Sequence, residues 1–167
     1  IACFSSTNKS AIFLPDPIFF RSNSYSEFRN FAASYKGLKK DEVYWRGSLT
    51  GWLSEGQDIK SLERYKLVHK TLEKPRFDCK LSGMGNYKNQ FSKIENTVLG
   101  DFEPQEKILE YQYLVDMDGN TASWPGLFTK LLSSGVVLKI LSEKIWYQWY
   151  YHRLIDKNNI LFFNSTD

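Results

Sequence analysis

Short apolar runs alternate along this chain with longer segments in which apolar residues recur at helical spacing. The short runs predict strands, and the helically spaced segments predict helices. Strands are expected at residues 1–4, 11–14, 18–20, 43–45, 77–81, 111–115, 136–138 and 159–163. Helices are expected at residues 26–36, 58–72, 104–109, 121–132 and 142–154. Helices that alternate with strands predict an α/β fold with a mainly parallel sheet.

The clearest unit is the strand–turn–helix–strand pattern between Tyr111 and Leu138. Its turn, Asp118-Gly119-Asn120, has the composition of a tight loop because glycine tolerates positive φ and Asp and Asn bond nearby backbone. Thr121 or Ser123 can cap the helix that follows. Free N–H groups and the helix dipole favour an anion at such a helix start. A phosphorylated ligand is therefore the first hypothesis for this loop.

The segment Arg46–Gly51, RGSLTG, is the second candidate for chemistry. It is expected at the end of the strand 43–45, where an arginine, two hydroxyls and glycine-flanked N–H groups can bind a diphosphate. Taken alone, an Arg-Gly turn is also typical of a surface loop that forms salt bridges. In parallel sheets ligands bind at the carboxyl ends of the strands, where this segment and the loop 118–123 are both expected.

The other segments predict structure more than chemistry. The prolines at 15 and 17 argue against a helix there, so residues 18–20 are expected to be extended. The charged face of helix 58–72, which includes Arg64, is interpreted as solvated. The aromatic residues of helix 142–154 are interpreted as core, with Trp124 and Tyr147 left open as surfaces for sugar stacking. Residues 83–96 are expected to form a long loop.

Composition narrows the classes of function. The chain has 167 residues, 42% of them hydrophobic and 16% aromatic, and a net charge of +3, which suits one folded domain over residues 1–167. Its lysines are dispersed, so a nucleic acid partner is not indicated, and peripheral association with an anionic membrane is permitted. Cys3 and Cys79 are interpreted as free thiols. No apolar run approaches the ~20 residues that span a bilayer.

Several of these motifs, in this order, resemble glycosyltransferase family 90. The resemblance covers Ile1–Thr7 with Leu14-Pro15-Asp16, then Tyr44–Thr50 (YWRGSLT), then DGNTASW…KLLSSGVVLK followed by WYQWYYHRL. The pattern SW-x-G-L-x-x-K-L-L is most similar to the LpsA branch, the bacterial lipopolysaccharide glycosyltransferases. Other members of the family are fungal capsule-associated xylosyltransferases and animal protein O-glucosyltransferases. Members are longer, so the chain looks like their middle and C-terminal portion, part of a two-domain enzyme.

The resemblance implies a Rossmann-like sheet in the two-domain architecture called GT-B. It implies transfer of a sugar from a nucleoside diphosphate, most simply UDP, to a glycan or glycolipid acceptor such as the lipopolysaccharide core. The implied diphosphate-binding residues are Arg46, Gly47, Ser48, Thr50 and Lys130. The implied nucleotide-sugar-binding residues are Asp118, Gly119, Asn120, Thr121, Ala122, Ser123 and Trp124. The implied location is the cytoplasm, at the inner face of a bacterial inner membrane, or the secretory lumen for a eukaryotic protein.

The chain departs from the family pattern in ways that bear on catalysis. Pro125 stands where many relatives have an arginine, and Lys130 is the nearest substitute. The general base implied by the family is an aspartate upstream of Ile1, which leaves the catalytic residues of this chain unassigned. Asp116 and Asp118 form an Asp-x-Asp pattern that can hold a divalent cation, but the family implies stabilisation of the diphosphate without a metal or other cofactor.

Two alternatives from other classes stay open. The first is a truncated or degenerate domain that binds a nucleotide or glycan without catalysis. The second is a different α/β enzyme that acts on a phosphorylated small molecule, although neither G-x-G-x-x-G nor G-x-x-x-x-G-K-[ST] occurs in the chain.

Overall fold

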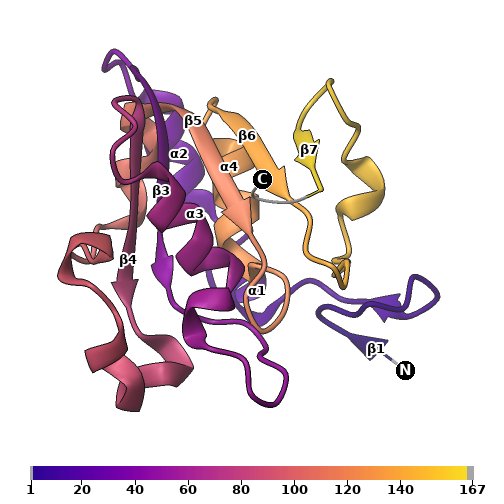
Figure 1. Cartoon of the computed structure of the whole chain (residues 1–167). Coiled ribbons are helices and arrows are strands. Elements are labelled where there is room, and N and C mark those ends of the chain that lie inside the picture. The colour runs from indigo at the N-terminus through magenta and orange to yellow at the C-terminus, as the bar shows by residue number, and fades with distance from the viewer. Residues whose placement is uncertain (1, 165–167) are drawn as a thin grey trace.

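The computed structural model describes residues 2–164, and their central feature is a five-stranded sheet, in the order β4-β3-β5-β6-β7 (Figure 1). All neighbouring strands in it are parallel. The strands are β3 (Lys40–Ser48), β4 (Phe77–Gly83), β5 (Tyr111–Met117), β6 (Val136–Ile140) and β7 (Leu161–Phe163). The predicted α/β class with a parallel, Rossmann-like sheet is confirmed.

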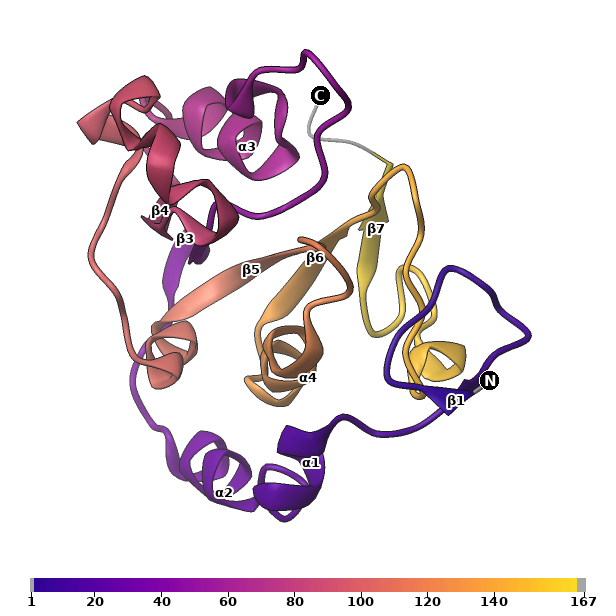
Figure 2. The same cartoon turned by 90° about the horizontal axis from the view of Figure 1, so that it is seen from below.

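Helices cover both faces of this sheet (Figure 2). One face carries α3 (Glu63–Thr71), preceded by the 3₁₀ turn Ile59–Ser61. The other face carries α1 (Pro17–Arg21), α2 (Ser26–Ser34) and α4 (Trp124–Leu132). Further 3₁₀ turns are Gly85–Lys93, Asn96–Val98, Gln105–Glu110 and Tyr151–Arg153. The strands β1 (Ala2–Cys3) and β2 (Ile12–Phe13) form a separate parallel pair that lies beside the segment around Tyr147.

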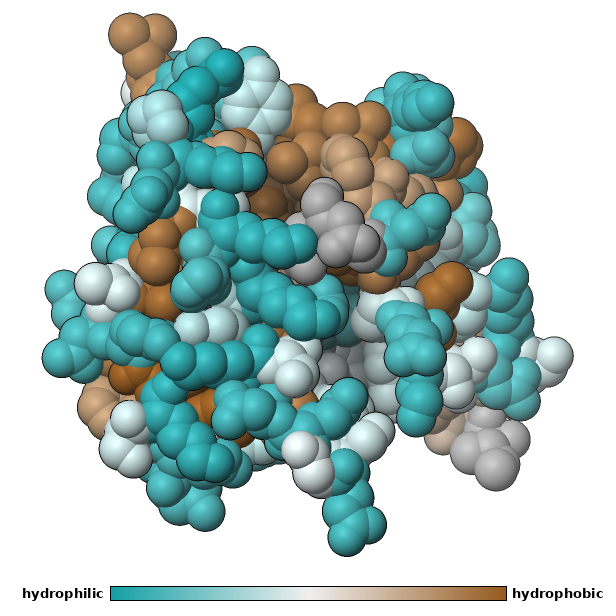
Figure 3. Space-filling model, in the orientation of Figure 1, coloured by the Kyte–Doolittle hydropathy of each residue, from teal (hydrophilic) through white to brown (hydrophobic). Residues whose placement is uncertain are grey.

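The alternation of side chains along the strands divides the core into two layers. Val115 and Met117 of β5 pack with Val68 of α3 in one apolar cluster. Leu114, the residue before Val115, points to the opposite face and packs with Tyr111 and the helices there. Among residues 2–164 no helix covers the α3 face of β6 and β7, and Val136 and Phe163 are exposed. A hydrophobic region lies over this part of the molecule in Figure 3. No described helix is long and apolar enough to cross a membrane.

The order of the strands creates a topological switch point between β3 and β5. The chain leaves β3 through α3 to reach β4 on one side, and leaves β5 through α4 to reach β6 on the other. The connections after these two adjacent strands therefore run to opposite sides, and ligands of open α/β sheets commonly bind at the carboxyl ends of the strands at such a point. These loops begin after Ser48 and after Met117.

Three local predictions are wrong. Residues 18–20 are helical, because Pro17 occupies the first turn of α1, where its fixed φ is favourable, and the Asp16 carboxylate accepts from the N–H groups of Ile18 and Phe19. The helix predicted at 58–72 is broken at Leu62, which is extended. The helix predicted at 142–154 is absent except for a 3₁₀ turn, since its aromatic residues pack in a compact coil against α4.

Candidate functional site

The two loops predicted to bind a phosphorylated ligand meet at the switch point. Asn120, in the loop after β5, accepts a hydrogen bond from the backbone N–H of Gly51 through Oδ1 at 3.0 Å. Its carbonyl oxygen accepts a second bond from Nε1 of Trp52 at 2.8 Å. Segments separated by about 70 residues thus form one surface, and we call the residues 48–52 and 118–123 the switch-point loops.

Arg64, at the start of α3, joins the ends of both strands. Its Nε donates to the carbonyl of Asp118 at 3.1 Å, and its two terminal nitrogens donate to the carbonyls of Ser48 at 2.8 Å and Met117 at 3.1 Å. Burial lowers the pKa of Arg64, although Asp116 and Asp118 partly oppose the shift; an arginine nonetheless stays protonated. The expectation that this side chain is solvated is wrong. The break at Leu62 begins α3 beside the sheet edge, so its first turn faces the loops.

A buried charge cluster lies beside the switch-point loops on the α4 face. Asp116 of β5 is fully buried and accepts from Lys130 of α4 and Lys139 of β6, both at 2.8 Å. Lys139 is also fully buried, and it bonds Asp118 at 2.5 Å. Ser142 donates to the second oxygen of Asp118 at 2.9 Å. We call Asp116, Asp118, Lys130, Lys139 and Ser142 the charge cluster. Neither Lys139 nor Ser142 was among the predicted site residues.

The ion pairs set the pKa values in the charge cluster. Burial raises the pKa of Asp116, but the lowering by Lys130 and Lys139 together is larger. The pKa of Asp116 therefore lies well below its usual range. Burial lowers the pKa of Lys139, and its carboxylate partners reverse this, so the lysine stays protonated. Burial dominates at Asp118 and raises its pKa despite Lys139. With Arg64, three cations face two carboxylates, and this excess of one positive charge favours an anionic ligand.

Arg46 lies within β3, two residues before its end, so the strand continues slightly beyond the predicted end at Arg46-Gly47. Its guanidinium bonds the Asp78 carboxylate at 2.6 Å, and the hydroxyl of Tyr111 bonds the same carboxylate at 2.6 Å. Nε of Arg46 is buried without a hydrogen-bond partner. Arg46 and Lys130 nevertheless line the same cavity of about 170 Å³ with Gly126 of α4. The structure therefore brings both predicted diphosphate-binding cations to one space beside the first turns of α4.

The small residues of the predicted set give the loops their close contact. A side chain at Gly119 would overlap Oγ1 of Thr50, and one at Gly47 would lie 2.8 Å from the indole of Trp45. The N–H of Gly119 donates to the carbonyl of Thr121 at 2.9 Å, which closes the loop after β5. Ala122 is buried below it. The small residues thus allow the two loops to pack closely against each other.

Ser123 is the N-cap of α4 but makes no side-chain capping bond, so its hydroxyl does not occupy the N–H groups of the first turn. Trp124 packs edge-on against Phe4, with ring centroids 5.6 Å apart, and its Nε1 is 3.4 Å from Oγ of Ser5. Trp124 is therefore directed toward the N-terminal strands instead of the switch-point loops. Tyr147 also lies there, with Lys9 over its ring at 5.2 Å.

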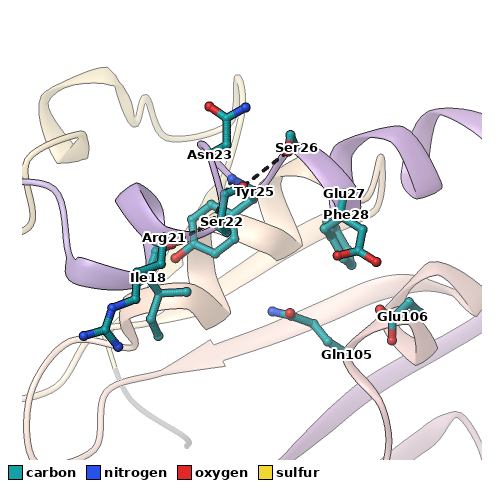
Figure 4. A pocket seen from close by; sticks show the side chains of 10 residues that line it. All are labelled: Ile18, Arg21, Ser22, Asn23, Tyr25, Ser26, Glu27, Phe28, Gln105 and Glu106. Carbon is teal, nitrogen blue, oxygen red and sulfur yellow. Dashed lines mark hydrogen bonds between the residues drawn. The ribbon is translucent and has the colours of Figure 1, made fainter.

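A larger cavity of about 410 Å³ lies elsewhere, between α1, α2 and the 3₁₀ turn 105–110 (Figure 4). Its wall includes the turn at Asn23 and Tyr25, whose φ values of 47° and 57° are left-handed, and the N–H of Ser26 bonds the carbonyl of Ser22 at 3.1 Å. None of the predicted site residues lines this cavity. Size alone therefore does not select it as the functional site.

The Asp-x-Asp pattern of β5 has partners other than a metal. Asp116 and Asp118 both bond Lys139, so their oxygens are occupied by a cation from the chain itself. Among residues 2–164, no three His, Cys, Asp or Glu side chains converge as a metal site would require. Cys3 and Cys79 are free thiols.

Comparison of the chain with models of protein families gives no match, and a search of curated proteins gives no significant match.

Proposed function

We propose that this chain is the donor-binding part of a glycosyltransferase of the GT-B architecture, which transfers a sugar from a UDP-sugar to a glycan acceptor such as the lipopolysaccharide core. The observation that carries the proposal is the meeting of the two switch-point loops at the carboxyl ends of β3 and β5, joined by Arg64. The family resemblance of the same two segments supports it.

Binding of the diphosphate would use cations and backbone N–H groups together. Arg64 contacts both loops from the α3 side of the sheet. On the other side, the uncapped start of α4 follows the loop 118–123 directly, and Lys130 pairs with Asp116, two residues before Asp118. Negative charge develops on the departing diphosphate during sugar transfer, and donors fixed in advance stabilise it without reorganisation. Arg64 is held by three carbonyl oxygens, so its position is set before a ligand arrives.

One observation favours a second candidate, a domain that binds a nucleotide or glycan without catalysis. An inverting transfer needs a base to accept the acceptor's proton. Within the charge cluster, Asp116 and Asp118 are both bonded to Lys139, so neither carboxylate is free for that role. A transferase would need the base from outside the charge cluster, whereas a binding domain would need none.

Titration of the protein with UDP in a calorimeter, with and without EDTA, tests donor binding. We expect binding that persists in EDTA and that weakens by about tenfold in Arg64→Gln, since a charged hydrogen bond contributes about 1.5–3 kcal/mol. Arg76→Gln is the control, because it removes the same charge far from the switch point. Arg76 is exposed, pairs with Asp41 and precedes β4, at the amino ends of the strands.

Equal loss of affinity in the Arg64 and Arg76 variants would contradict a role for the switch point. No binding by the wild-type chain at millimolar UDP would contradict the donor-site proposal for this part of the protein. Turnover of a UDP-sugar separates the two candidates, because the non-catalytic domain binds UDP and releases no product.

A further inference from the structure

Trp52 stands out among the five tryptophans of the chain, all of which lie within the described residues. It is 71% exposed, whereas Trp45 is 3% exposed. Single exposed apolar side chains are common on protein surfaces. Trp52 differs from them in its position, because it belongs to the switch-point loop that follows β3 and touches the loop that follows β5.

The exposed indole is held in one orientation. Its Nε1 donates to the carbonyl of Asn120 at 2.8 Å. The preceding residue, Gly51, is fixed through both of its backbone groups, since its N–H bonds Asn120 and its carbonyl accepts from the hydroxyl of Tyr87 at 2.8 Å. The following residue, Leu53, packs against the apolar cluster under α3. An aromatic ring restrained on both sides loses little conformational entropy when a ligand covers it.

We propose that Trp52 is the platform on which the base of a nucleotide ligand stacks. This inference rests on the proposed donor site and adds to it the residue that contacts the base. Every nucleobase presents a flat π-face, and stacking on an aromatic side chain needs no hydrogen-bond readout. The same loop carries Thr50, which lies against Gly119 in the loop proposed to hold the phosphates. The platform and the anion-binding groups therefore belong to one continuous surface.

If the base stacks on Trp52, the contribution of the base to affinity can be measured apart from that of the phosphates. Removal of the indole takes away the contact to the base and leaves Arg64, Lys130 and the start of α4 in place. The affinity for UDP should therefore fall, while the affinity for inorganic pyrophosphate, which has no base, should not. The expected fall is about tenfold or more, in line with alanine substitution at other base–aromatic stacks.

The experiment is calorimetric titration of four proteins with UDP and with pyrophosphate: the wild type, Trp52→Ala, Trp52→Phe and Phe20→Ala. Phe20 is the matched control because it is an exposed aromatic residue, 65% accessible, on α1. We expect Trp52→Ala to weaken UDP binding and not pyrophosphate binding. Trp52→Phe keeps a ring and should stay within about threefold of the wild type. Phe20→Ala should match the wild type with both ligands.

Each contrary result overturns the inference in a distinguishable way. Equal UDP affinity in the wild type and Trp52→Ala overturns the platform and leaves the donor site standing. Equal loss for UDP and pyrophosphate overturns it too, because the indole would then act on the loop and not on the base. A wild-type chain that binds neither ligand overturns both the platform and the donor site.

Discussion

The two faces of the central sheet differ most along β5, where neighbouring residues belong to different environments. Val115 and Met117 point to α3 and are surrounded by apolar side chains. Asp116, between them, points to α4 and bonds two lysines. A buried ion pair seldom stabilises a protein more than apolar packing of the same volume would. Along β5, Val115 and Met117 therefore contribute to stability through apolar packing, and Asp116 keeps charge in the interior at a cost that a ligand site would explain.

Polar residues extend this difference across the sheet. Tyr44 of β3 is paired with Leu114 of β5. Arg46 and Asp116, each two residues further along, therefore lie at the same level of the sheet, and Asp116 is paired with Lys139 of β6. Strands of a parallel sheet are usually apolar on both faces. Charged residues at this level, beside the carboxyl ends of the strands, indicate a functional surface because perturbed ionisable groups concentrate at such sites.

The largest expected effect comes from Asp116→Asn. The substitution keeps the shape of the side chain but leaves Lys139 with Asp118 alone and Lys130 without its carboxylate partner. We expect the free energy of unfolding to fall by about 3–5 kcal/mol, because removal of one partner of a buried ion pair leaves the other charge buried without compensation. Urea denaturation measures it. A fall below about 1 kcal/mol would show that the lysines find other partners.

A smaller loss is expected on the apolar face from Leu67→Ala in α3. Leu67 is buried in the core cluster under α3, and its truncation leaves a cavity there. The free energy of unfolding should fall by about 3 kcal/mol, within the range for such substitutions. UDP affinity measured well below the denaturation midpoint should not change. If Leu67→Ala weakens UDP binding as much as Arg64→Gln does, the effect of Arg64→Gln is a loss of α3 packing and not the loss of a ligand contact.

The smallest effect is a difference in pH dependence between the wild type and Asp116→Asn. The pKa of Asp116 is depressed in the folded protein, so its contribution is complete above the unfolded value of about 3.9 and is lost as the pH falls toward the folded value. The stability gap between the two proteins should be constant from pH 7 to pH 5. It should narrow below about pH 4, by at most about 1.4 kcal/mol per pH unit. A gap that stays constant down to pH 3 would show that Asp116 is not held as an anion by the lysines.

The candidate site could be predicted in part because its loops are marked by local chemistry. Asp118-Gly119-Asn120 interrupts an apolar run and is followed by a helix start, and the structure has its loop there. Arg46 and Lys130, which the family resemblance implied as diphosphate-binding residues, line one cavity. Arg64 and Lys139 could not be found in this way. Arg64 is one of several charges on its helix, and only the break at Leu62 directs it to the sheet edge.

The sequence by itself determined the α/β class, the positions of β3, β5 and β6, and the loops between strands and helices, because short-range periodicity and turn residues encode them. Only the tertiary structure decided the order of the strands and the partners across them. Lys139 follows a short apolar run, and nothing in the local sequence indicates its partner. The register of β5 and β6 pairs it with Asp116. The same is true of Trp52, whose indole is fixed by a carbonyl 68 residues away. Contacts between distant segments depend on topology, and no local pattern records topology.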